Sequence, residues 1–143
     1  MNGRFRQIAD WFEALSPETL SSIDTVYDAQ SLFRDPFHDI QGIEKIKAVY
    51  QHMFDGLDTP RFKVTRIVEQ GDESFMTWIF TFALKGKPYE ITGCTHFTLD
   101  PVSLLVIVHR DYWDAAQELY EKLPVLGWFL RRLRRMLSLF PQH

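Results

Sequence analysis

The chain has 143 residues, 45% of them hydrophobic, and carries a formal net charge of −3. This length suits one domain with a sizeable core, and 12 Phe, 5 Tyr and 4 Trp are enough to wall a cavity as well. The single cysteine, Cys94, excludes an intrachain disulfide. No apolar run approaches the roughly 18 residues of a membrane span, and the N-terminus lacks a signal-peptide pattern. We therefore expect a cytoplasmic protein.

The first half of the chain has the periodicity of helices. Apolar residues recur at nearly 3.6-residue spacing over residues 4–15, which predicts an amphipathic helix. The sequence SPET at 16–19 offers an N-cap, a proline at the first helical position and an acid in the first turn, so a short helix is expected over about 17–27. A short strand over 29–36 then ends at an Asp-Pro turn, and a third helix is expected over about 42–54.

The second half has the periodicity of strands. Strands are expected over 61–70, 74–84, 89–99 and 104–113, separated by turns with Gly, Pro or Asp. The second of them alternates most regularly, and its predicted inner face consists of Met76, Trp78, Phe80, Phe82 and Leu84. Three helices followed by a meander predict an α+β domain in which the helices pack on one side of a curved antiparallel sheet.

Residues 115–143 form a predicted helical extension to the domain at 1–114. Apolar residues recur there at i, i+3, i+4 and i+7, and the extension ends in a basic stretch without acids over 124–143. Three interpretations remain open: a lid packed on the domain, a contact with a second subunit, or an amphipathic helix on an anionic membrane surface. The residues that would meet such a membrane are Trp128, Phe129, Arg131, Arg132, Arg134 and Arg135. The rest of the chain is acidic, which argues against a nucleic-acid partner.

Three short motifs carry a resemblance to a known family. They are FRDPFHDIQG at 33–42 before a helix, GCTHFTLD at 93–100 on the penultimate strand, and HRDYWD at 109–114 closing the last strand. In this order, the chain resembles the nuclear transport factor 2-like superfamily, in its SnoaL-like and ketosteroid isomerase-like branch. The resemblance implies a cone-shaped α+β fold whose helices and sheet enclose a cavity, and a homodimer through the open face of the sheet.

Asp35 has two interpretations. An aspartate before proline commonly caps backbone N–H groups of its own turn. The isomerases that the chain resembles keep their general base in the corresponding turn, so the resemblance implies that Asp35 is a cavity-facing base. A base needs apolar surroundings, which Phe33, Trp78 and Phe97 are expected to supply.

The resemblance also indicates other residues of a ligand site. The isomerases stabilise the developing enolate with a tyrosine and a protonated aspartate, and the corresponding positions here hold Trp11 and Thr95, which can each donate one hydrogen bond. His38 is interpreted as a solvated loop residue or as a side chain at the cavity mouth beside Asp35. His96 is expected to be a packing histidine with a hydrogen-bond partner.

The stretch HRDYW leaves the orientation of the last strand open. Strand alternation places Arg110 and Tyr112 on one face and His109 and Asp111 on the other. We favour Arg110 and Tyr112 in the cavity, as partners of Asp35 and of developing negative charge; the alternative is an inward His109–Asp111 pair. A β-bulge would exchange the two faces, and a surface ladder of ion pairs is the non-functional interpretation.

These observations predict a protein that binds a small apolar or lipid-like molecule in its interior. One hypothesis adds cofactor-free acid/base catalysis of the isomerase, cyclase or dehydratase type. The other is a non-catalytic binding or accessory module, peripheral to a membrane through its C-terminal helix. Neither needs a cofactor, and the scattered histidines show no metal-ligand spacing.

Overall fold

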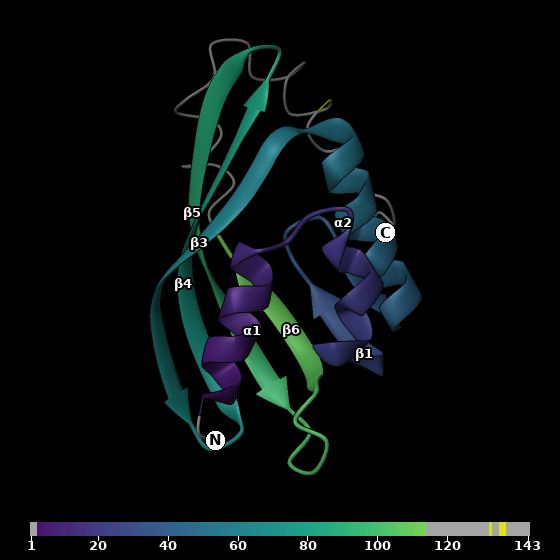
Figure 1. Ribbon diagram of the computed structural model, residues 1–143, viewed down its shortest axis with the longest axis vertical. Coiled ribbons are helices and arrows are strands. Elements are labelled where there is room, and N and C mark those ends of the chain that lie inside the picture. The colour runs from purple at the N-terminus through teal and green to yellow at the C-terminus, as the bar shows by residue number, and fades with distance from the viewer. Residues whose placement is uncertain (1–2, 114–131, 133–134, 137–143) are drawn as a thin grey trace.

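The computed structural model describes residues 3–113, 132, 135 and 136 of the chain. Its elements, in chain order, are α1 (Arg4–Glu13), the 3₁₀ helix η1 (Thr19–Thr25), β1 (Tyr27–Arg34), β2 (Asp39–Gln41), α2 (Ile43–Gly56), β3 (Asp58–Gln70), β4 (Glu73–Leu84), β5 (Lys87–Leu99) and β6 (Val106–Tyr112). Figure 1 shows them as a ribbon.

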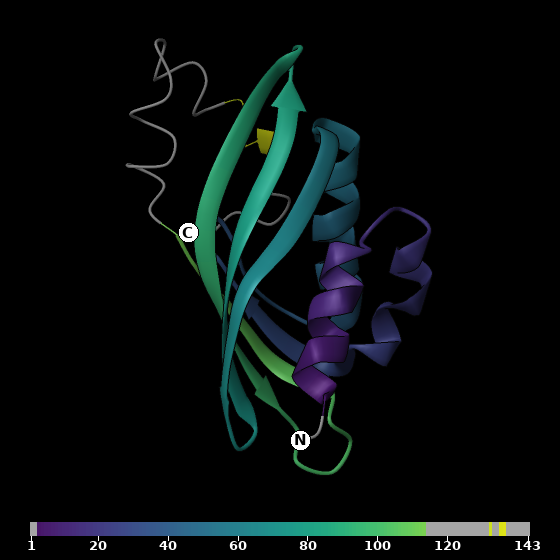
Figure 2. The ribbon, with the colours of Figure 1, turned by 60° about the vertical axis from the view of Figure 1, so that its left-hand side comes forward.

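The strands form one sheet with the order β2-β1-β6-β5-β4-β3. Strands β3 to β6 make the antiparallel meander that the sequence predicts, and β1 joins the free edge of β6 in parallel. The sheet is therefore mixed rather than wholly antiparallel. Its parallel strand, β1, comes from the half of the chain that also contains the helices. All three helices lie on one face of the curved sheet (Figure 2). The predicted α+β class is confirmed.

Two elements differ from the prediction. The second helix is shorter than expected and is a 3₁₀ helix. Strand β2 has no counterpart among the predicted strands. It has three residues, of which only Ile40 is buried, and so short a segment shows no recognisable alternation of apolar and polar residues. It pairs with β1 across the Asp-Pro turn. Gly42, with φ 104°, then directs the chain into α2.

The core lies between the helices and the inner face of the sheet. The inner face of β4 is as predicted, with Met76, Trp78, Phe80, Phe82 and Leu84 buried. Helix α1 places Phe5, Ile8, Ala9 and Phe12 against it. Glu13 holds the end of this helix on the sheet by accepting a hydrogen bond from the backbone N–H of Val64 at 2.9 Å.

A β-bulge in β6 sets the orientation of its C-terminal half. Leu99 of β5 pairs with Val106, whereas the preceding residue, Thr98, pairs with Val108. From Thr98 to Leu99, β5 advances by one residue while its partner β6 advances by two, from Val108 back to Val106. The extra residue in β6 exchanges the inward-facing and outward-facing positions on the two sides of the bulge. As a result Val106 and His109 are both buried on the inner face.

Most of the predicted C-terminal helix lies outside the described residues. Two residues within it are placed against α2: His52 Nε2 donates a hydrogen bond to the backbone oxygen of Arg135 at 2.6 Å, and Met136 packs on the core. No helix among the described residues is long and apolar enough to cross a membrane.

Candidate functional site

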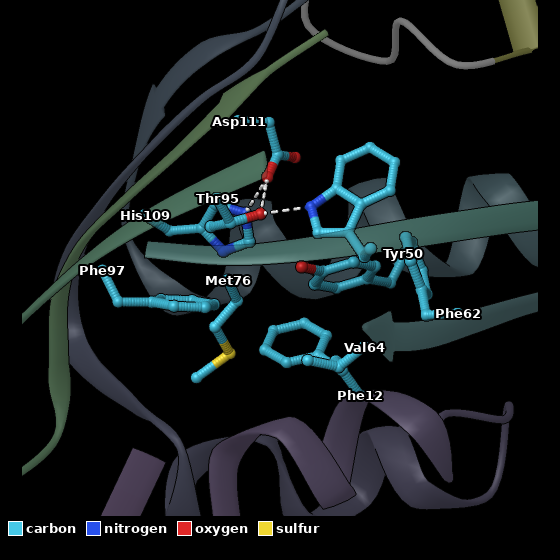
Figure 3. Close-up of a pocket in the computed structure, with 10 residues that line it drawn as sticks. Phe12, Tyr50, Phe62, Val64, Met76, Thr95, Phe97, His109 and Asp111 are labelled. Carbon is cyan, nitrogen blue, oxygen red and sulfur yellow. Dashed lines mark hydrogen bonds and ion pairs between the residues drawn. The ribbon is translucent and has the colours of Figure 1, made fainter. Parts of the chain in front are cut away.

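A pocket lies between the inner face of the sheet and the helices. Its enclosed volume is about 40 Å³, and it opens to solvent. Most of its wall is apolar, but one side carries polar groups from β5 and β6 (Figure 3). The lining residues are Phe12, Tyr50, Phe62, Val64, Met76, Trp78, Thr95, Phe97, His109 and Asp111.

Asp111 and His109 form the polar centre of this pocket. Both point inward because of the bulge in β6, and His109 Nε2 lies 2.8 Å from Asp111 Oδ1. The His109 side chain is buried, at 4% exposure, while that of Asp111 is 18% exposed. The imidazole N–H thus donates to the carboxylate, which keeps its other oxygen, Oδ2, without a partner among the described residues.

Thr95 holds the same carboxylate oxygen, and Trp78 in turn holds Thr95. The Thr95 hydroxyl donates to Asp111 Oδ1, and the Trp78 indole N–H donates to the Thr95 oxygen at 2.8 Å. The indole reaches Thr95 because it lies flat over Gly93, its pairing partner on β5. A Cβ at Gly93 would lie 2.4 Å from a ring carbon of Trp78, so only glycine fits here without a shift.

Two tyrosines extend the network behind His109. The Tyr27 hydroxyl lies 2.7 Å from His109 Nδ1 and 2.8 Å from the Tyr50 hydroxyl. Burial, followed by the negative charge of Asp111 among the causes, raises the pKa of Tyr50 well above its usual value. Burial also raises the pKa of Tyr27, with Tyr50 as the next cause. Both phenols therefore remain protonated, and Tyr27 can donate to Nδ1 while Nε2 donates to Asp111.

A second pocket adjoins the first and contains Asp35. Its enclosed volume is about 70 Å³, and it shares Tyr50, Phe62, Trp78 and Asp111 with the first pocket. The residues that line it but not the first pocket are Phe33, Asp35, Phe37, Val49, Met53, Phe80, Ile91 and Trp113. Asp35 and Asp111 therefore both line this second hollow.

Asp35 also caps its own turn. Its Oδ1 accepts hydrogen bonds from the backbone N–H groups of Phe37 at 2.8 Å and His38 at 2.6 Å. His38 Nδ1 lies 3.0 Å and 3.1 Å from its two oxygens. The side chain of Asp35 is only 14% exposed. Both interpretations of Asp35 thus describe part of its environment: it caps the turn and it lines the hollow.

The structure corrects several placements predicted from sequence. His38 is fully buried, so the solvated loop position is wrong; it lies beside Asp35 but lines none of the pockets that Asp35 or Asp111 lines in the described part of the chain. The interior positions of Arg110 and Tyr112 are also wrong, because the β6 bulge turns them to the outer face, where Tyr112 is 46% exposed. The alternative orientation, with His109 and Asp111 inward, is the one observed.

Other predicted residues divide between the pocket and its surroundings. Trp78, Thr95 and Phe97 line the first pocket and Phe33 lines the second. Trp11 lines neither, since its indole N–H donates to Ser22 Oγ at 3.0 Å. His96 lies on the outer face and has the expected hydrogen-bond partner, Glu73, at 2.8 Å.

Tyr27 and Tyr50 are the site residues that sequence reasoning missed. Tyr50 belongs to the apolar stripe of α2 and Tyr27 begins β1, so core packing alone explains both positions. A signal was present, since a buried phenol normally finds a hydrogen-bond partner. Among the described residues, no three histidine, cysteine or acidic side chains converge as metal ligands would.

The comparisons with known proteins agree with this architecture. The model of the SnoaL-like domain family matches residues 8–101. No curated protein of known sequence is similar to the chain at a significant level. Among solved structures, an LEH-like epoxide hydrolase from M. tuberculosis is similar, with a TM-score of 0.71, 17% identity, and coverage of 94% of this chain and 93% of that one.

Two further structures are similar to the chain. A candidate SnoaL-like polyketide cyclase from Shewanella putrefaciens has a TM-score of 0.69 and 20% identity, covering 85% of each chain. A Catenulispora acidiphila protein with a ketosteroid isomerase-like fold, solved with trimethylamine, has a TM-score of 0.70 and 16% identity, covering 87% of this chain and 95% of that one. At these identities the likeness shows the fold alone.

Proposed function

Because the chain belongs to the SnoaL-like domain family, we propose that it binds a small apolar molecule in the hollow and moves a proton on it without a cofactor. Asp111 acts as the general base. Its Oδ1 is held by His109 and Thr95, and its Oδ2 is left for the substrate. The observation that carries the proposal is this oxygen, which has no partner in the described part of the chain and lies beside an apolar wall.

The surrounding network prepares Asp111 for this role. Two hydrogen bonds to Oδ1 fix the orientation of the carboxylate. Tyr27 and Tyr50 are protonated, so Tyr27 can donate to His109 Nδ1 while the Nε2 N–H of His109 points at Asp111. The pocket that Asp111 lines has an apolar wall, supplied by Phe12, Phe62 and Phe97.

The reaction class is an isomerisation, cyclisation or dehydration that begins with removal of a proton next to an activating group. Similarity to an epoxide hydrolase and a candidate polyketide cyclase supports such acid/base chemistry on this fold. Asp35 lines the adjoining pocket and adds a second negative charge near the substrate, but its Oδ1 is engaged with its own turn.

A simple probe tests the proposal. 5-Nitrobenzisoxazole opens its ring when a desolvated carboxylate removes its C3 proton, and the product is coloured. We expect wild-type protein to accelerate this reaction and Asp111→Asn to lower the rate about 10²-fold or more. Asp10→Asn, a change of the same kind at an exposed position on α1, is the control and should leave the rate unchanged.

A carrier without catalysis is the second candidate, and one observation favours it. The polar hydrogens of Trp78, Thr95, Tyr50 and His109 all have partners within the network. None of these donors is free to stabilise a developing oxyanion. If the probe binds but wild-type and Asp111→Asn proteins open it equally slowly, the protein is a carrier and the catalytic proposal is wrong.

A further inference from the structure

Two arginines lie side by side on the outer face of the sheet, near the hollow. Arg34 and Arg110 are directly paired across the parallel strands β1 and β6. Their preceding neighbours, Phe33 and His109, are each only 3% exposed on the inner face, so alternation turns both arginines outward. Neighbouring strands lie about 4.8 Å apart, and like charges on directly paired residues destabilise a sheet.

Neither guanidinium has an ion-pair partner among the described residues. The contact made by Arg110 is with the ring of Tyr112, whose centroid lies 4.9 Å from its Cζ. Asp39 is paired with Arg34 across β1 and β2 but forms no ion pair with it in this part of the chain. Two adjacent guanidinium groups without an ion pair among the described residues remain available to an anion, although Asp39 lies opposite Arg34 and two further aspartates line the neighbouring hollow.

A surface hollow lies at these arginines and shares three of its lining residues with an inner pocket. It holds about 980 Å³ of space, counted with its wide mouth. Its lining residues are Arg34, Asp35, Pro36, Arg110, Asp111, Tyr112 and Trp113. Asp35, Asp111 and Trp113 also line the second inner pocket. A molecule held by the arginines at one end can therefore extend past Trp113 towards the apolar pockets.

We propose that Arg34 and Arg110 bind the carboxylate of an organic acid whose apolar body lies in the inner pockets. Guanidinium groups bind carboxylates through paired, charge-assisted hydrogen bonds. Because Asp35 and Asp111 line the same hollow, a singly charged carboxylate is favoured over a doubly charged phosphate. This inference rests on the proposed function and narrows its substrate class to amphipathic acids.

Calorimetric titration with a matched pair of ligands tests the inference. The probes are 2-naphthylacetate and its uncharged amide, which have the same apolar body. We expect wild-type protein to bind the acid about tenfold more tightly than the amide at low salt, and less selectively at high salt. The double variant Arg34→Gln/Arg110→Gln should bind both probes equally.

Arg66→Gln is the matched control. It removes one positive charge, against two in the double variant, from an exposed position on β3 at the opposite edge of the sheet, and should keep the preference for the acid. The inference is overturned if wild type binds the acid no better than the amide, or if Arg66→Gln loses the preference as fully as the double variant. Opening of the uncharged 5-nitrobenzisoxazole by Asp111 does not depend on these arginines, so failure of one test leaves the other intact.

Discussion

The two aspartates of the hollow are held in different ways. Asp35 lies in a turn, and its Oδ1 accepts two backbone N–H groups of that turn. Asp111 lies on a strand, and its Oδ1 accepts hydrogen bonds from the side chains of His109 and Thr95. Each aspartate is paired with a buried histidine, so the histidine alone does not distinguish them.

This difference indicates that the Asp35 carboxylate has a structural role, whereas the Asp111 carboxylate is available to a substrate. Removing Asp35 leaves two backbone donors of its own turn without their acceptor, which affects the fold directly. Removing the charge of Asp111 affects the side-chain donors His109 and Thr95 rather than the backbone of a turn. Asp35 therefore contributes mainly to stability, and Asp111 is the better placed of the two for chemistry.

The largest expected effect on stability follows from loss of the Asp35 turn. Asp35→Ala should lower the free energy of unfolding by about 2–4 kcal/mol, because two N–H groups and His38 lose their acceptor. Urea denaturation measures this loss. Asp39→Ala, at an exposed position on β2, is the control and should change stability by about 0.5 kcal/mol or less. Equal stability of the two variants would contradict the assigned role of Asp35.

A smaller effect is expected at the support of Asp111. Gly93→Ala places a methyl group against the Trp78 ring, and overpacking of this kind costs about 1–3 kcal/mol. The indole should move away from Thr95 and change its fluorescence. The double variant Gly93→Ala/Trp78→Phe makes room for the methyl group and should recover part of the stability. If Gly93→Ala changes neither the free energy of unfolding nor the fluorescence, the position of the Trp78 indole does not depend on its close contact with Gly93.

The smallest effect concerns the two buried phenols at high pH. Their pKa values are raised in the folded protein, so above about pH 10 the unfolded chain loses protons that the folded chain keeps. Stability should therefore fall as the pH rises beyond that value. Tyr50→Phe should lose about 1 kcal/mol at neutral pH and show a shallower alkaline decline. Thermal unfolding against pH measures both, and equal alkaline slopes would contradict the buried network.

Much of the fold is predictable from the sequence, because the spacing of apolar residues in a long helix or strand shows which of its faces is buried. The alternation in β4 and the helical spacing in α1 each predict a buried face that the structure contains. The pairing of β1 with β6 is not predictable in this way, since it depends on which strand edge is free after the meander forms. Such long-range pairing leaves no local pattern in the chain.

The candidate site is harder to predict for a definite reason. One bulged residue in β6 exchanges the faces of Arg110 and Asp111, and nothing in LLVIVHRDYW marks where the extra residue lies. Asp35 is recognisable because the Asp-Pro turn is a local signal. Tyr27 and Tyr50 are not, because a tyrosine in an apolar stripe looks the same whether or not its hydroxyl joins a network.

Whether Asp111 or Asp35 removes the proton can be measured directly. The experiment compares Asp35→Asn and Asp111→Asn in the opening of 5-nitrobenzisoxazole, after circular dichroism confirms that both variants are folded. Asparagine keeps an oxygen that can accept the backbone hydrogen bonds of the Asp35 turn. We expect a loss of about 10²-fold or more for Asp111→Asn and of less than about tenfold for Asp35→Asn. The reverse order would show that Asp111 is not the base and would return that role to the Asp-Pro turn.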